Sequence, residues 1–266
     1  MRLRRFTPVQ KGFHVLLILS FLVQSVTGLA RMYTGSRWSQ TLAEAFGGYA
    51  GCLAVHKIVG LLMLALFAAH IVYIVLVYSQ GKMSKEDTLV FEAKDAKQFI
   101  SHLGWMFGGK APQFERWGYW EKFDYWAVFW GMVILGVTGI MLYSPLVTAS
   151  FFEGWTLNVA LWVHRIEACL AMLHVFVIHF AIAHLRRHNF PMDRAMFGGD
   201  ADMLSVKEER PAWIQRLKNE GKLDSLIVED IPPAARIGSF LFGLGAVALG
   251  IYLVIGALQN VAFINW

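Results

Sequence analysis

The sequence predicts an all-α membrane protein, a helical bundle that crosses the bilayer several times. Of its 266 residues, 56% are apolar and 16% are charged, and the mean hydropathy is +0.48. This composition is too apolar for an ordinary soluble domain. A bilayer core needs about 20 helical residues to be crossed. Five apolar stretches meet that length: 13–33, 52–78, 124–147, 157–185 and 237–258. Strands of a transmembrane barrel would alternate polar and apolar residues instead.

Basic residues concentrate on one side of the predicted bundle. Most of the 24 Lys and Arg lie before the first stretch, between the second and third, or between the fourth and fifth. Because loops rich in Lys and Arg stay in the cytoplasm, we expect the N-terminus inside the cell and the C-terminus outside. The net charge of +5 follows from this asymmetry, so it does not indicate a nucleic-acid partner.

The connections between the spans are too short for large domains. Residues 92–107 place apolar side chains at helical spacing among charged ones, which favours a helix on the inner membrane surface over a solvated loop helix. The charged connection 188–236 is long enough for a few helices but not for an enzymatic core. No CxxCH motif occurs, which excludes covalent c-type haem. Cys52 and Cys169 are expected to be unpaired, about 13 Å apart at 1.5 Å per helical residue.

Buried histidines are the most informative residues of the chain, because imidazole is costly in hydrocarbon and indicates a function there. His56 and His164 lie near the outer ends of the second and fourth spans, which run in the same direction. His70 and His179 follow them after 14 and 15 residues, about 21 to 22 Å of helix rise. His14 begins the first span, and His174 and His184 also lie in the fourth. A single such histidine would usually be a packing or proton-carrying residue, but matched layers favour bound cofactors.

Haem fits these layers better than a hard or catalytic metal. Opposed imidazoles are present without the neighbouring carboxylates or thiolates that zinc and di-iron sites use. Glycines in the first and third spans leave room for a flat macrocycle, although small residues are also ordinary helix-packing positions. These glycines are Gly28, Gly131, Gly136 and Gly139.

Two basic residues inside the apolar spans each directly follow an outer histidine. They are Lys57, after His56, and Arg165, after His164. A buried cation needs an anion, and a haem propionate at this level would provide one. Two alternatives stay open: both side chains reach outward to the membrane surface, or Glu167 pairs with Arg165.

Four segments resemble a known family. They are RRFTPVQKGFHVLLILSFLVQSVTG at the start, the HKIVG segment at His56, EKFDYWAVFWGMVILGVTGIMLYSP in the third span and VHRIEACLAMLHVFVIHF in the fourth. Together they resemble the b-type cytochrome gamma subunits of membrane-bound formate dehydrogenases and the cytochrome b subunits of nickel-iron hydrogenases. The resemblance covers about residues 4–187. It implies a bacterial cytoplasmic (inner) membrane protein with haem b.

The resemblance also implies the haem ligands. It pairs His56 with His164 for an outer haem and His14 with His179 for an inner one. Depth alone would instead pair His70 with His179, so both inner pairs stay open. A third haem that uses His70 or His184 is a further alternative. These assignments divide the chain into a dihaem cytochrome b domain (1–187), a cytoplasmic charged connection (188–236), and a fifth transmembrane helix with a short outer tail (237–266).

The resemblance implies a function in respiratory electron transport. A partner on the outer face, an iron-sulfur or multihaem cytochrome c subunit, would exchange electrons with the outer haem. Menaquinone or ubiquinone would react near the inner one. Glu121, Lys122 and Asp124 match the family's quinone region in position, although charges that end a helix would look the same. Two other functions stay open: a free-standing transmembrane electron-transfer reductase, and a non-haem transporter in which the histidines carry protons or a metal.

Overall fold

The computed structural model describes residues 1–82, 84–184, 189–190 and 192–265. Five helical segments in it are long and apolar enough to cross a membrane, which confirms the predicted all-α bundle. They are α1 (Pro8–Met32), α3 (Gly48–Ser79), α5 (Tyr119–Tyr143), the fourth span Trp155–His184 and α12 (Pro233–Gln259). Residue 185, at the end of the predicted fourth span, and the basic residues 186–187 lie outside the described residues.

The fourth span is not a uniform helix. It consists of α7 (Trp155–Leu173), a π-helical turn (His174–His179) and α8 (Phe180–His184). A π-helical turn inserts one residue into an α-helix without breaking it, and such turns occur mostly at functional sites.

Local sequence explains where the other long helices begin. Thr7 and Gln10 form a reciprocal capping box before Pro8, which occupies the first turn of α1. Gly47 precedes α3 with a φ of +79°, a conformation that only glycine adopts freely. The Glu121 carboxylate accepts a hydrogen bond from the Gly118 N–H at the start of α5 (2.8 Å).

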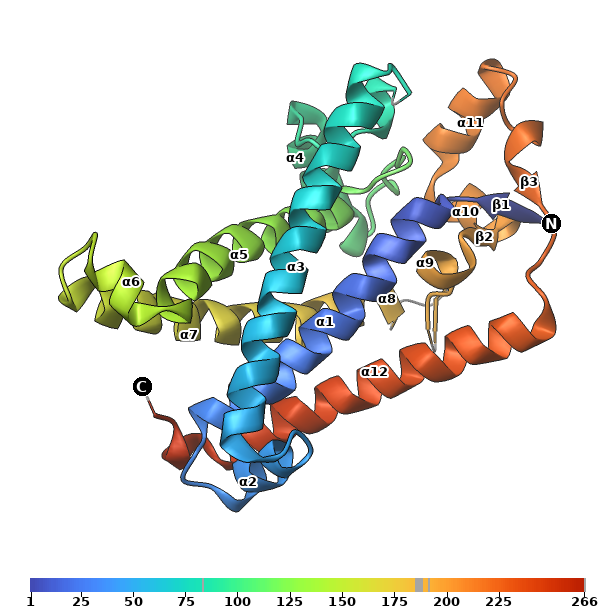
Figure 1. Cartoon of the computed structure of the whole chain (residues 1–266). Helices are drawn as coiled ribbons and strands as arrows, with labels where there is room; N and C mark the ends of the chain where they lie inside the picture. Colours follow the sequence, from blue (N-terminus) through green and yellow to red (C-terminus); the bar gives the residue numbers. More distant parts are fainter. Residues whose placement is uncertain (83, 185–188, 191, 266) are drawn as a thin grey trace.

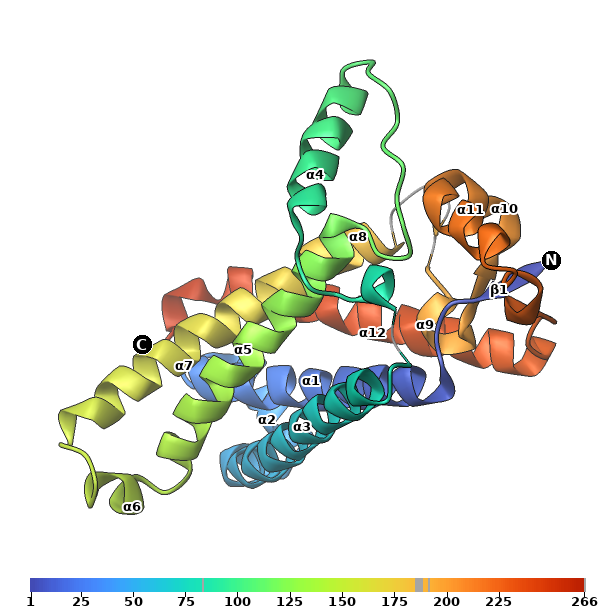
Figure 2. The ribbon, with the colours of Figure 1, turned by 90° about the horizontal axis from the view of Figure 1, so that it is seen from above.

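The long helices are arranged as two antiparallel pairs plus one additional helix. α1 packs along α3, and α5 packs along α7, while the second pair diverges from the first (Figure 1). α12 packs against both α1 and the π-helical turn, and Figure 2 shows it crossing the fourth span. The apolar faces of α3 and of the fourth span are little covered by protein, since only 6% of either apolar window is buried. This exposure is typical of lipid-facing helices.

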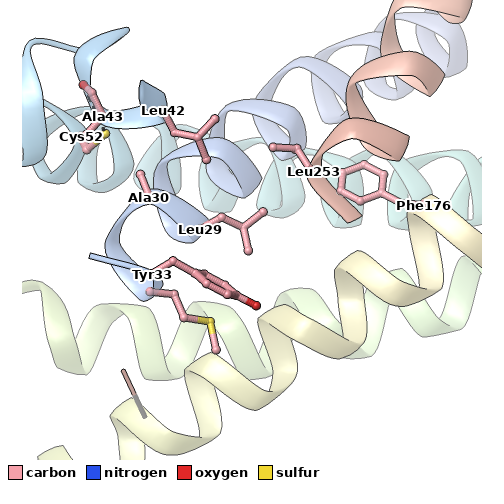
Figure 3. Packing of buried hydrophobic residues seen from close by; sticks show 9 residues of the cluster. Leu29, Ala30, Tyr33, Leu42, Ala43, Cys52, Phe176 and Leu253 are labelled. Carbon is pink, nitrogen blue, oxygen red and sulfur yellow. Dashed lines mark hydrogen bonds between the residues drawn. The ribbon is translucent and has the colours of Figure 1, made fainter. Parts of the chain in front are cut away.

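The short helix α2 (Arg37–Glu44) and a hydrophobic cluster close the end of the bundle at which α1 ends and α3 begins. The short helix α6 (Pro145–Ala149) connects α5 to α7. Leu29 of α1, Cys52 of α3, Phe176 of the π-helical turn and Leu253 of α12 belong to one buried cluster there (Figure 3). Cys52 and Cys169 are both free, as predicted. Near the C-terminus, a 3₁₀ turn (Val261–Phe263) follows α12.

At the opposite end, the chain folds into a small unit that the sequence did not predict, here called the cap. The N-terminal strand β1 (Arg2–Arg4) lies between β2 (Asp200–Asp202) and β3 (Ile227–Val228), antiparallel to both. Helices α10 (Met203–Glu209) and α11 (Pro211–Asn219) cover the sheet, with a 3₁₀ turn (Asp224–Leu226) before β3. Its core contains Leu3, Met203, Val206, Trp213, Ile214 and Leu217. The charged connection thus folds around the first residues of the chain.

The remaining helices lie near the cap. α9 (Ala195–Gly198) precedes β2, a 3₁₀ turn spans Lys85–Asp87, and α4 (Ala93–Met106) precedes α5. α4 confirms a helix within 92–107, and its Phe99, Ile100 and Leu103 are exposed, so its apolar face is free to contact lipid.

Candidate functional site

The rings of His56 on α3 and His164 on α7 lie opposite each other, with their centroids 6.3 Å apart. Two imidazoles bound to opposite faces of one metal place their centroids about 6 Å apart, because each metal–nitrogen bond is about 2 Å and each centroid lies about 1 Å behind its nitrogen. The observed spacing therefore fits a group held by both histidines.

Two threonines fix the orientation of these rings. Thr27 Oγ1 lies 2.9 Å from His56 Nδ1, and Thr138 Oγ1 lies 2.9 Å from His164 Nδ1. Each hydroxyl already donates its proton to the carbonyl four residues earlier, Val23 O or Ile134 O (both 2.7 Å). Each hydroxyl can therefore only accept from the imidazole, so Nδ1 carries the proton. The lone pair is then on Nε2, which is free to bind iron.

The residue after each threonine is glycine, and it borders the histidine ring. A Cβ on Gly28 would lie 3.5 Å from His56 Cε1, and one on Gly139 would lie 3.4 Å from His164 Cε1. A longer side chain at either position would enter the space beside the free Nε2. These two glycines therefore fit the predicted clearance for a macrocycle.

Basic groups surround this histidine pair without acidic partners. Lys57 donates to the Tyr143 carbonyl (2.8 Å) and lies over the Tyr143 ring. Arg31 of α1 is close enough to Arg165 for their charges to repel. Within the described part of the chain, neither arginine has an acidic partner, and Glu167 forms no ion pair with Arg165. This arrangement is suited to an anionic group, and the sequence reading had missed Arg31.

The second histidine pair is His14 on α1 with His179 of the π-helical turn, and their ring centroids are 6.5 Å apart. His14 Nδ1 is buried without a hydrogen-bond partner in the described structure. His179 Nδ1 lies 2.5 Å from Asp124 Oδ2. Since an ionised carboxylate can only accept, His179 Nδ1 carries the proton and its Nε2 is free for a metal. This pair also fits a group held between two imidazoles.

The π-helical turn explains why the histidine interval in the fourth span is 15 residues and that in α3 is 14. The extra residue lies within the turn that ends at His179. Because the turn accommodates it locally, the helix before and after keeps its facing direction. His179 thus occupies the position that corresponds to His70 on α3.

His70 and His184 have other surroundings. His70 packs against Phe13 of α1, and its Nε2 lies 3.2 Å from the Tyr125 hydroxyl. His184 Nδ1 accepts from the backbone N–H of Asp193 (3.2 Å), and its ring lies 6.3 Å from that of His179. His184 and His179 follow each other on one helix, so a macrocycle cannot enter between them.

The three predicted quinone residues have different partners. Glu121 accepts from Arg5 (3.0 Å) and from two nitrogens of Arg210 (both 2.9 Å). Lys122 donates to Asp95 (2.8 Å) and to a backbone carbonyl. Only Asp124 contacts a histidine of the predicted ligand set, and it also contacts His174.

Thr27 and Thr138 were not predicted as residues of this site, although the sequence contains a signal for both. Val-Thr-Gly occurs at 26–28 in α1 and again at 137–139 in α5. Each copy faces a histidine that is followed by a basic residue and isoleucine, at His56 and at His164. The repeated motif identifies both threonines as partners of the histidines. The Asp124–His174 contact depends on the π-helical turn and has no comparable signal.

Comparison with known proteins identifies the family of the chain. The family model described as prokaryotic cytochrome b561 matches residues 5–199. The chain is also similar to the cytochrome b556(fdo) subunit of formate dehydrogenase from Escherichia coli strains K12 and O6:H1. The identity to each is 21% over 214 residues, which cover 80% of this chain and 92% of the relative. The match covers α1, α3, α5 and the fourth span, and the chain belongs to the prokaryotic cytochrome b561 family of multi-pass membrane proteins that transfer electrons with haem b.

Proposed function

We propose that this chain is the membrane subunit that connects a respiratory oxidoreductase to the quinone pool. It holds two b-type haems, one between His56 and His164 and one between His14 and His179. Each haem supplies one-electron transfer at its iron. The chain's own residues orient the ligands, balance charge and separate the two sites from water.

The observation that carries this proposal is the hydrogen bonding of both Nδ1 atoms in the His56–His164 pair. Thr27 and Thr138 hold both rings with Nδ1 protonated and Nε2 free. A pair of packing or proton-carrying histidines would not need two matched tautomers. Lys57, Arg165 and Arg31 supply positive charge where haem propionates would lie.

The inner ligand pair is His14 with His179, and we propose two haems without a third. The ring spacing between His14 and His179 supports this pair over His70 with His179. His70 is hydrogen-bonded to Tyr125 and His184 to a backbone N–H. Both have roles in hydrogen bonding that need no iron.

Quinone, either menaquinone or ubiquinone, would react at the end of the bundle that carries the His14–His179 pair. The basic loops favour the cytoplasmic side for this end, with the N-terminus inside and the C-terminus outside. Glu121 is paired with Arg5 and Arg210, and Lys122 is paired with Asp95. We propose that both residues fix the start of α5. Of the three predicted quinone residues, Asp124 is then the one in contact with the proposed redox site, through His179.

The electron-transfer partner would bind at the opposite, outer end, near α2 and α6. The similarity to a subunit of formate dehydrogenase supports a hydrophilic partner with iron-sulfur clusters or c-type haems. A free-standing reductase would purify without such a partner. A proton or metal transporter would be colourless.

Spectra of the purified chain test the proposal. We expect a b-type reduced-minus-oxidised spectrum and two haems per chain. His56→Ala and His164→Ala should each remove the same spectral component, and His14→Ala and His179→Ala the other. A colourless protein, or variants of one proposed pair that remove different components, would contradict it.

A further inference from the structure

The two proposed haem sites differ in the groups that bind the Nδ1 atoms of their histidines. At the His56–His164 pair both partners are neutral hydroxyls, from Thr27 and Thr138. At the other pair, His179 donates to the carboxylate of Asp124 at 2.5 Å. His14 Nδ1 has no partner in the described structure. Of these four histidines, only His179 hydrogen-bonds a carboxylate in the described structure.

We propose that Asp124 is a positioning residue that lowers the reduction potential of the haem held by His14 and His179. The proposal rests on the proposed function, because it requires His179 to be a ligand. A carboxylate that accepts from Nδ1 makes the imidazole a stronger electron donor. A stronger donor stabilises the oxidised iron, and hydrogen bonding behind a ligand is one of the means by which proteins set haem potentials.

The surroundings of Asp124 strengthen this effect. Its side chain is 21% exposed in the isolated chain, and the bilayer covers α5. Hydrogen bonds and charges act more strongly in such a low-dielectric environment. Lys122, the closest basic residue along the chain, is paired with Asp95, so it does not neutralise Asp124.

His174 moderates the charge on Asp124. Its Nε2 donates to Oδ1 at 2.8 Å while His179 donates to Oδ2. The two histidines are the first and last residues of the π-helical turn, five positions apart. In a π-helix, residues five apart lie on the same side of the helix, so the turn brings both imidazoles to one carboxylate. The bond from His174 withdraws part of the charge that Asp124 offers to His179.

Potentiometric titration of the haem spectrum tests the role of Asp124. Asp124→Asn keeps an oxygen acceptor for His179 but removes the charge. At a fixed potential, the ratio of reduced to oxidised inner haem should rise tenfold or more, which corresponds to about 59 mV for one electron. The haem at His56 and His164 should not shift. As a matched control, Glu167→Gln removes a carboxylate from α7 and should leave the inner haem unshifted.

A second series keeps the test valid if Asp124→Asn loses the inner haem. His174→Leu removes the second donor and leaves the whole charge to His179, so the inner potential should fall. His174→Gln restores a donor and should return the potential toward that of the unmodified chain. If neither series moves the inner potential while both haems stay bound, the proposal is wrong. If the unmodified chain shows no b-type spectrum, the proposed function fails instead.

Discussion

The two histidine layers are built on the same pairs of helices, but only one layer is symmetric. At the His56–His164 level, α1 and α5 both present Thr-Gly, and α3 and α7 both present a histidine followed by a basic residue. Each helix pair thus contributes the same elements. This symmetry explains why both rings have the same tautomer and the same kind of neutral partner.

At the other level the equivalent positions carry different residues. Thirteen residues before its Thr-Gly, α1 has His14 and α5 has Tyr125. Opposite them, α7 leads into His179 and α3 has His70. His14 faces His179, whereas Tyr125 bonds His70. The scaffold offers two equivalent places for a ligand pair, and only one has two histidines. The comparison indicates that the choice of residues, rather than the fold, decides which of the two positions has opposed histidines.

Changing the length of the π-helical turn should have the largest effect on this comparison. An alanine inserted between Val177 and Ile178 would rotate His179 by about 100° relative to α7 and remove it from both His14 and Asp124. We expect the haem-to-protein ratio to fall from two to one, with the His56–His164 component retained.

Deletion of Val177 is the matched control. It restores the 14-residue interval found between His56 and His70, which an uninterrupted α-helix accommodates. Both haems should then remain bound. An insertion that retains both haems would show that the turn does not set the position of His179.

Removing the carboxylate charge of Glu121, which joins the cap to α5, should have the next largest effect. That effect should be confined to the cap end of the molecule. Glu121→Gln removes the carboxylate charge that Arg210 and Arg5 both bind. Breaking such a buried pair costs about 3 to 5 kcal/mol. We expect trypsin to cleave within 200–228 much faster, with an unchanged spectrum at the His56–His164 level.

Glu115→Gln is the control for this variant. Glu115 pairs with Arg216 at 3.0 Å. Arg216 also pairs with Asp87 at 2.7 Å and keeps that partner, so the loss of Glu115 should cost about 1 kcal/mol or less. Equal proteolysis of the two variants would indicate that Glu121 does not hold the cap in place.

The spans could be predicted from the sequence because bilayer thickness requires long apolar runs. The first run was expected to begin at 13, yet α1 begins at Pro8, since a capping box starts a helix without regard to hydropathy. The cap could not be predicted. Its strands have two or three residues each, and β1 pairs with a strand about 200 positions away, so no periodic pattern indicates it.

The candidate site was predictable to a different extent at its two ends. His56 and His164 follow from depth, because α-helical rise converts residue number into position. The partner of His179 does not follow from depth, which favours His70. The direction of the His179 side chain depends on the change to π-helical hydrogen bonding over His174–His179. A π-helical turn arises from packing around it and has no composition of its own.

Removing the hydroxyls of the symmetric layer should have a moderate effect. In Thr27→Val and Thr138→Val, Nδ1 of one ring loses its acceptor while the volume is preserved. Loss of such an outer partner typically lowers metal affinity by about 10- to 100-fold. We expect each variant to release the His56–His164 haem faster to an apo-haemoprotein acceptor, by a similar factor. A large difference between the two would contradict the symmetry.

The smallest effect is expected from changes at His70 and Tyr125. These residues occupy the position that is equivalent to the inner site but lacks a second histidine. His70→Leu and Tyr125→Phe each remove the hydrogen bond between these residues. Because His70 faces a tyrosine and a phenylalanine rather than a second imidazole, neither change should remove a haem, and both spectral components should persist.

Tyr125→His is the informative complement, since it creates the missing histidine opposite His70. If the scaffold is symmetric at this level, this variant alone should gain haem, from two to three per chain. A chain that keeps two haems in Tyr125→His would show that helix spacing, and not only the residue at 125, restricts the second position.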